Sequence, residues 1–137
     1  MAGELTLRVI TPDRIALDTT ADSVVFPGVD GLIGVLPRHA AMVAALDAGP
    51  LTYTAGGTKH TLFISGGFAE VRDNTVRFVT QAGELAQHID LERAREAEKR
   101  ARERLEQARA GAEDIDFVRA EAALRRALMR LRVRESV

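Results

Sequence analysis

The C-terminal part of the chain carries one hexapeptide pattern twice, and this repeat constrains the fold more than any other feature. The two copies are Ile89-Asp90-Leu91-Glu92-Arg93-Ala94 and Ile115-Asp116-Phe117-Val118-Arg119-Ala120. In each copy an Asp precedes small or apolar residues spaced three or four apart, which is the pattern of a capped helix. Gly111 lies between the copies, where it can end the first helix and turn the chain. The sequence therefore predicts an antiparallel hairpin of two helices, each roughly 25–30 Å long.

The predicted contact between the two helices consists mainly of alanine. Its members are Leu91, Ala94, Ala97, Ala101, Leu105 and Ala108 on the first helix, and Phe117, Ala120, Leu124, Ala127 or Leu128, and Leu131 on the second. Alanine lets two helices approach closely but buries little apolar area. At about 25 cal/mol per Å² such a contact is a weak clamp.

Arginine crowds the other faces of the hairpin. Residues 117–137 hold six Arg against two Glu, a formal charge of +4. Arg119, Arg126 and Arg130 have the spacing of one helix face. One interpretation is a solvated face whose charges pair with Glu. The other is a weakly held cationic hairpin that closes on an anion or opens onto an acidic partner.

Residues 1–81 have the pattern of short β-strands. Alternation begins with Leu5, Leu7 and Val9, and turn signals recur every eight to twelve residues, among them Gly28–Gly31, Ala55–Gly57, Gly66–Gly67 and Asp73–Asn74. This spacing favours a sandwich or a barrel. Residues 81–88 look like a polar connector, after which Val, Gly and Thr give way to Ala, Arg and Glu. We therefore expect two domains, residues 1–86 and 87–137, and an α+β fold overall.

Composition excludes several classes of protein. The chain has no Cys, and no run of 18 apolar residues that would span a membrane. A pI of about 6.3 and an aromatic content of 4% argue against a nucleic-acid-binding protein. The three histidines, at 39, 60 and 88, lack metal-ligand spacing. Because no catalytic triad or Walker A loop is visible, an enzyme has the least support.

Four stretches together resemble the epsilon subunit of bacterial F-type ATP synthases, nearly end to end. They are Val9-Ile-Thr-Pro-Asp, Gly31-Leu-Ile-Gly-Val-Leu-Pro-Arg-His-Ala, Ser65-Gly-Gly-Phe-Ala-Glu-Val and Ile89-Asp-Leu-Glu-Arg-Ala. Each motif is weak alone, but four in the right order over 137 residues are specific.

The resemblance implies an N-terminal sandwich of about ten strands followed by the helical hairpin. It implies a non-catalytic subunit of the central stalk, whose sandwich contacts the gamma subunit and the c-ring. The hairpin would restrain ATP hydrolysis when it extends toward an acidic region of the catalytic beta subunits. The expected location is peripheral, on the cytoplasmic face of the bacterial cell membrane, with no direct membrane insertion and no nucleic-acid partner.

Two groups of site residues follow from the resemblance. The residues expected to contact the c-ring and gamma are Asp30, Gly31, Leu32 and His39. Some relatives carry an acidic residue at the position of Leu32. Some members bind ATP on the folded hairpin, which carries over to Ile89, Asp90, Arg93 and Ala94 from the signature, and to Glu84, Arg100, Arg126 and Arg130 by aligned position.

The chemistry of these residues agrees with a nucleotide. Guanidinium groups from two helices can bind phosphates, and the start of the first helix offers free N–H groups. Asp90 would act as the N-cap or bind the base or ribose. ATP is thus expected as a regulatory ligand, with no obligatory cofactor. The alternatives are an inhibitory hairpin that binds no ATP and, more remotely, a nucleic-acid-binding arginine helix.

Overall fold

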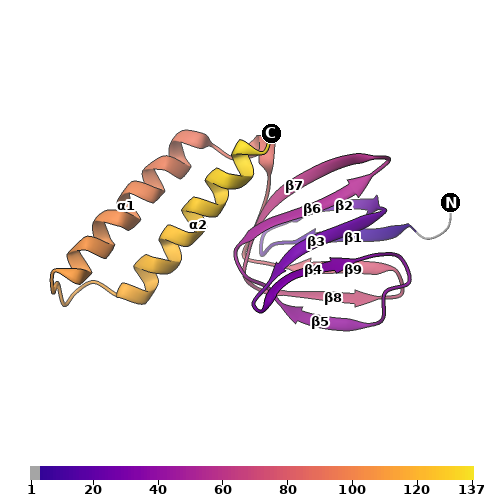
Figure 1. Ribbon diagram of the computed structural model, residues 1–137, viewed down its shortest axis with the longest axis horizontal. Helices are drawn as coiled ribbons and strands as arrows, with labels where there is room; N and C mark the ends of the chain where they lie inside the picture. Colours follow the sequence, from indigo (N-terminus) through magenta and orange to yellow (C-terminus); the bar gives the residue numbers. More distant parts are fainter. Residues whose placement is uncertain (1–3) are drawn as a thin grey trace.

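The computed structural model describes residues 4–137 and consists of a β-sandwich with a helical hairpin packed beside it (Figure 1). One sheet has the order β2 (Ile15–Ala21), β1 (Leu5–Ile10), β9 (Thr75–Val79), β8 (Phe68–Arg72), β5 (Met42–Ala45). The other has the order β10 (Ala82–Leu85), β7 (Thr58–Ser65), β6 (Gly49–Ala55), β3 (Ser23–Gly28), β4 (Gly31–Val35). The predicted sandwich and its ten strands are confirmed.

The sandwich core follows from strand alternation. Leu5, Leu7 and Val9 are fully buried, whereas the residues between them are only half-buried, because successive side chains point to opposite faces. At the centre, the rings of Phe26 and Phe78 meet edge to face, 4.9 Å apart. Phe26 is on β3 and Phe78 is on β9, so this contact joins the two sheets.

The hairpin turns lie where the sequence places them. Gly56 and Gly57 connect β6 to β7 with φ of 57° and 79°, a left-handed conformation that glycine adopts without strain. Asp73 and Asn74 connect β8 to β9 with φ of 49° and 59°. Asp and Asn adopt positive φ more readily than most other residue types, so this two-residue turn suits the sequence.

The interpretation of residues 81–88 as a polar connector is wrong. These residues form strand β10 and a 3₁₀ helix, η1 (Ala86–His88). Strand β10 pairs antiparallel with β7, with Glu84 opposite Phe63. Gly83 faces the core, where an added Cβ would lie 3.0 Å from a methyl group of Val9. The glycine that looks like a loop residue is therefore needed for close packing.

The hairpin consists of α1 (Leu91–Arg109) and α2 (Phe117–Glu135), which are 19 residues long each. Both predicted N-caps are present: the carboxylate of Asp90 accepts the Arg93 N–H, and that of Asp116 accepts the Arg119 N–H. Each bond satisfies an N–H group that the first helical turn leaves free.

The predicted contact between the helices needs one correction. Ala94, Ala101 and Leu105 of α1 and Ala120 and Ala127 of α2 are buried, as expected for the alanine positions. Phe117 is instead 41% exposed, whereas Val133, which lies outside the predicted contact, is buried; of the alternatives Ala127 and Leu128, Ala127 is the buried one. The reason is that α2 packs against both α1 and the sandwich, so a single stripe does not describe its buried surface.

The hairpin contacts the sandwich mainly through α2, which lies between α1 and the strands in Figure 1. A small apolar cluster at this junction contains the buried residues Phe63, Ala86, Ile89, Ala94 and Val133. Two ion pairs also cross the junction: Arg130 with Glu84, and Arg125 with Asp47.

Candidate functional site

A pocket of about 380 Å³ lies where the sandwich, α1 and α2 meet, and we call it the inner pocket. Its lining comes from β10, η1, the start of α1 and the end of α2: Glu84, His88, Ile89, Asp90, Arg93, Ala94, Ala97, Arg100 and Arg130. Three guanidinium groups and two carboxylates thus share one concave surface with apolar patches. Such a surface is suited to a ligand that has both an apolar part and anionic groups.

Helix capping determines how α1 presents its side of the pocket. The Oδ1 atom of Asp90 accepts the Arg93 N–H at 3.1 Å, which fixes the first turn. Arg93, Ala97 and Arg100 then follow at helical spacing and line the same pocket. Because the Asp90 carboxylate is engaged with the backbone, its charge is partly offset beside the arginines.

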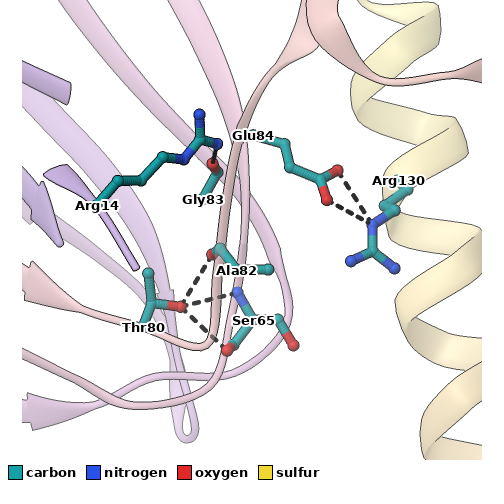
Figure 2. A network of polar contacts seen from close by, with 7 residues as sticks. All are labelled: Arg14, Ser65, Thr80, Ala82, Gly83, Glu84 and Arg130. Carbon is teal, nitrogen blue, oxygen red and sulfur yellow. Dashed lines mark hydrogen bonds and ion pairs between the residues drawn. The ribbon is translucent and has the colours of Figure 1, made fainter. Parts of the chain in front are cut away.

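Arg130 connects the pocket to the sandwich. Its Nε lies 3.1 and 3.3 Å from the two carboxylate oxygens of Glu84, which projects from β10 toward α2 (Figure 2). The Arg130 guanidinium also lies 4.5 Å from the centre of the Phe63 ring. In this arrangement Nε is the nitrogen engaged by Glu84, and the two Nη atoms form no hydrogen bond with residues 4–137.

The energy of this contact is modest. The side chains of Arg130 and Glu84 are 28% and 32% exposed, so water screens the pair. An ion pair of this kind contributes at most about 1 kcal/mol, and a cation–π contact of this kind contributes about 0.5–1 kcal/mol. Together with the small apolar cluster, the contact holds α2 on the sandwich without locking it there.

The structure brings together seven of the eight residues expected at a nucleotide site. Glu84, Ile89, Asp90, Arg93, Ala94, Arg100 and Arg130 all line the inner pocket. Arg126 does not: it lines two neighbouring pockets instead, one turn of α2 away from Arg130.

Sequence reasoning missed two contributors to the junction, Phe63 and the Arg125–Asp47 pair. Phe63 belongs to the run Leu62-Phe63-Ile64, whose members are all fully buried. An uninterrupted apolar run in a strand indicates burial on both faces, and this signal was available. Nothing in the sequence indicates that Arg125 pairs with a residue 78 positions away.

The residues expected to contact gamma and the c-ring do not lie together: Asp30, Gly31 and Leu32 form an exposed tip, whereas His39 lies in the loop after β4, at the other end of that strand. Asp30 and Gly31 lie at the β3–β4 turn, and Leu32, which follows them, is 73% exposed. The ring of His39 makes a 2.7 Å hydrogen bond with the Ala40 carbonyl through Nδ1. An apolar side chain this exposed at a turn is compatible with a partner surface.

Residues 4–137 contain neither a helix suited to cross a membrane nor a cluster of metal-ligating side chains. Neither helix has the length and apolar composition that crossing a membrane requires. Within the same residues, no three His, Asp or Glu side chains are grouped so that they could hold a metal ion.

The fold of residues 4–137 is a ten-stranded β-sandwich followed by a two-helix hairpin, and this architecture defines the class of protein. Family models confirm this class: "ATP synthase, Delta/Epsilon chain, beta-sandwich domain" matches residues 4–86, and "ATP synthase, Delta/Epsilon chain, long alpha-helix domain" matches residues 87–135. The chain therefore belongs to the ATP synthase delta/epsilon family, and it is a non-catalytic subunit of the central stalk.

Individual relatives agree with this assignment. The ATP synthase epsilon chain of Nitratidesulfovibrio vulgaris (strain DP4) is 47% identical over 134 residues, which is 98% of each chain. That of Symbiobacterium thermophilum is 48% identical over 131 residues, covering 95% of this chain and 92% of the relative.

Solved structures have the same fold. A chain in the mitochondrial ATP synthase of Euglena gracilis, in a structure of OSCP, F1 and the c-ring, matches with a TM-score of 0.78 and 27% identity over 93% of this chain and 79% of that one. A chain of the Tetrahymena thermophila central stalk and c-ring structure matches with a TM-score of 0.61, 16% identity and coverage of 96% and 94%.

Proposed function

We propose that this chain couples the rotor to the c-ring through its sandwich and restrains ATP hydrolysis through a mobile hairpin. ATP in the inner pocket would favour the folded hairpin. The partners would be gamma and the c-ring, which would contact the tip at Asp30, Gly31 and Leu32 and, at the other end of β4, the loop that holds His39. When the hairpin extends, its arginines would contact an acidic region of the catalytic beta subunits. The complex would place the chain on the cytoplasmic face of the bacterial cell membrane.

The observation that carries the proposal is that the inner pocket is built from three separate elements. Glu84 belongs to the sandwich, Arg93 and Arg100 belong to α1, and Arg130 belongs to α2. The pocket therefore exists only while the hairpin is folded against the strands. A ligand that binds only the folded form stabilises it by RT ln(1 + [L]/Kd), about 2.7 kcal/mol when the ligand concentration is 100 times Kd.

That amount is comparable with the polar contacts of Arg130 that help to hold the hairpin on the sandwich. The ion pair and the cation–π contact of Arg130 contribute about 1 kcal/mol each at most. Ligand binding can therefore shift the population between folded and extended hairpins, which is the requirement for a sensor.

Calorimetry on the purified chain tests the nucleotide site. We expect ATP to bind with a Kd between about 1 μM and 1 mM. Replacing Arg93 and Arg100 by Gln should abolish this binding, whereas replacing Arg95 and Arg102, on the outer side of α1, should not. Arg126→Gln should have a smaller effect than Arg100→Gln, because Arg126 lies outside the pocket. No heat at millimolar ATP would exclude the sensor and leave a hairpin that inhibits without nucleotide.

The parent ATPase complex tests the inhibitory role. Removing residues 88–137 should leave a complex whose ATP hydrolysis is faster than that of the complete assembly. A shorter deletion that removes only residues 136–137 serves as a control, because it keeps both helices. Equal hydrolysis rates with and without the hairpin would contradict inhibition but not the coupling role of the sandwich.

A further inference from the structure

A second cationic pocket, of about 580 Å³, lies between α1 and α2 nearer to the loop that joins them, and we call it the outer pocket. Its three basic residues are Arg104 of α1 and Arg119 and Arg126 of α2. Ala120 and Ala123 contribute small side chains to its lining, which leaves space between the guanidinium groups. All lining residues come from the hairpin and its loop, so the outer pocket does not depend on the sandwich.

The arginines of the two pockets are arranged on one side of the hairpin. Arg104 follows Arg100 by one helical turn on α1, and Arg126 precedes Arg130 by one turn on α2. Among residues 4–137, Arg104, Arg119 and Arg126 form no ion pair.

The opposite side of α1 differs in this respect. There Arg95 pairs with Glu92 and Arg102 pairs with Glu98, and Lys99, Glu103 and Glu106 complete a surface of mixed sign. Arg95 and Arg102 thus have carboxylate partners within α1, whereas Arg104 has none among residues 4–137.

Two carboxylates do belong to the outer pocket, those of Asp114 and Asp116. Oδ1 of Asp116 accepts the Arg119 N–H at 3.1 Å as the N-cap of α2. This carboxylate therefore already uses one oxygen as a hydrogen-bond acceptor for the backbone. Three guanidinium groups against two carboxylates leave a formal charge of +1. This excess positive charge is confined to the outer pocket, and the arginines that supply it belong to both helices.

We propose that the outer pocket binds a phosphate-type oligoanion, independently of the inner pocket. Guanidinium groups suit this chemistry because each presents paired N–H donors to phosphate oxygens. A ligand held by Arg104 on one side and by Arg119 and Arg126 on the other joins the two helices to each other. It therefore stabilises the closed hairpin as a unit, whether or not the hairpin rests on the sandwich.

Inorganic tripolyphosphate, titrated into the full chain and followed by backbone NMR, tests the proposal. We expect amide shifts at Ala120 and Ala123 that persist when ATP saturates the inner pocket. Shifts confined to Ala94 and Ala97 would overturn the proposal, as would shifts at Ala120 and Ala123 that disappear in Arg93→Gln/Arg100→Gln, or the absence of binding at millimolar concentrations. ATP titrated into Arg93→Gln/Arg100→Gln shows whether the phosphate chain of a nucleotide can also occupy the outer pocket.

Two double variants separate position from net charge. Arg104→Gln/Arg119→Gln should weaken tripolyphosphate binding by at least about tenfold. Arg95→Gln/Arg132→Gln also removes one arginine from each helix but touches neither pocket, and it should change affinity by less than about twofold. Equal losses in the two variants, or no loss in the first, would overturn the proposal. Glutamine keeps helix propensity, and circular dichroism checks that both hairpins are folded.

The outcomes also separate this proposal from the nucleotide sensor. Tripolyphosphate binding without ATP binding would remove the sensor and leave the outer pocket. ATP binding without tripolyphosphate-induced amide shifts at Ala120 and Ala123 would support the nucleotide sensor and overturn the outer-pocket proposal.

Discussion

The sandwich and the hairpin bury their apolar residues in different ways. The sandwich packs large side chains from two sheets, with Phe26, Phe78 and Leu51 fully buried. The hairpin buries mostly alanine, and Leu105 and Val133 are its only buried larger residues within residues 4–137. Burying a Phe or Leu side chain contributes about 1.5–3 kcal/mol, whereas a methyl group contributes about 0.8 kcal/mol. The sandwich is therefore stabilised by its own core, whereas the hairpin depends on weak apolar contacts and on charge.

The largest effect that sharpens this comparison is expected in the sandwich core. Phe78→Ala removes one ring of the edge-to-face pair that joins the two sheets. We expect the free energy of unfolding of the sandwich to fall by about 3–5 kcal/mol, because the cavity is enclosed on all sides. Urea denaturation measures it. A loss below about 1 kcal/mol would contradict a tightly packed core.

The matching substitution in the hairpin is Leu105→Ala. Leu105 is 5% exposed and is the largest side chain buried between the two helices. We expect a loss of about 2–3 kcal/mol that falls on the helices alone, since the sandwich does not depend on this contact. Hydrogen exchange should show faster exchange in α1 and α2, with protection in β7 and β9 unchanged. Equal loss of protection in the strands would mean that the two parts unfold together.

A smaller effect is expected at the junction from Glu84→Gln. This change removes the charge that faces Arg130 but keeps an oxygen acceptor. Because both side chains are about a third exposed, the docked hairpin should lose at most about 1 kcal/mol relative to the undocked one. Arg130→Gln should produce a larger loss, because it also removes the contact with Phe63. The fraction of undocked hairpin, measured by NMR exchange, gives both values.

The smallest effect is expected from Asp47→Asn. The Arg125 side chain is 57% exposed, so its pair with Asp47 is strongly screened. The Oδ1 acceptor for the Ala48 N–H is retained in Asn. We expect a change of about 0.2 kcal/mol, seen at low salt and lost near 1 M salt, where the screening length is about 3 Å. A change that does not depend on salt would indicate that Asp47 acts through the backbone rather than through Arg125.

Local chemistry in the sequence predicted most of the fold. Asp90 and Asp116 identified the helix starts, and Asp73–Asn74 identified a hairpin turn, because these residues act on backbone groups close to them in sequence. Strand β10 was missed because its Gly83 and Glu84 have tertiary roles. Gly83 packs against Val9, and Glu84 pairs with Arg130 from 46 positions away.

The candidate site was predictable to a similar extent. The signature at 89–94 and the positions aligned with the family led to the inner pocket, but the alignment also placed Arg126 there with Arg130, and Arg126 lies outside it. The structure separates them along the axis of α2: Arg130 reaches Glu84 and the inner pocket, whereas Arg126, one turn earlier, lines the pockets nearer to the loop.

The distance between the sandwich and the far end of the hairpin tests most directly whether a weakly held hairpin is controlled by its ligand. The chain has no Cys, so spin labels can be attached at Lys59→Cys on β7 and at Glu113→Cys in the loop, both exposed. We expect two distance populations without nucleotide and a shift to the shorter one as ATP is added. A single distance that ATP leaves unchanged would contradict the account.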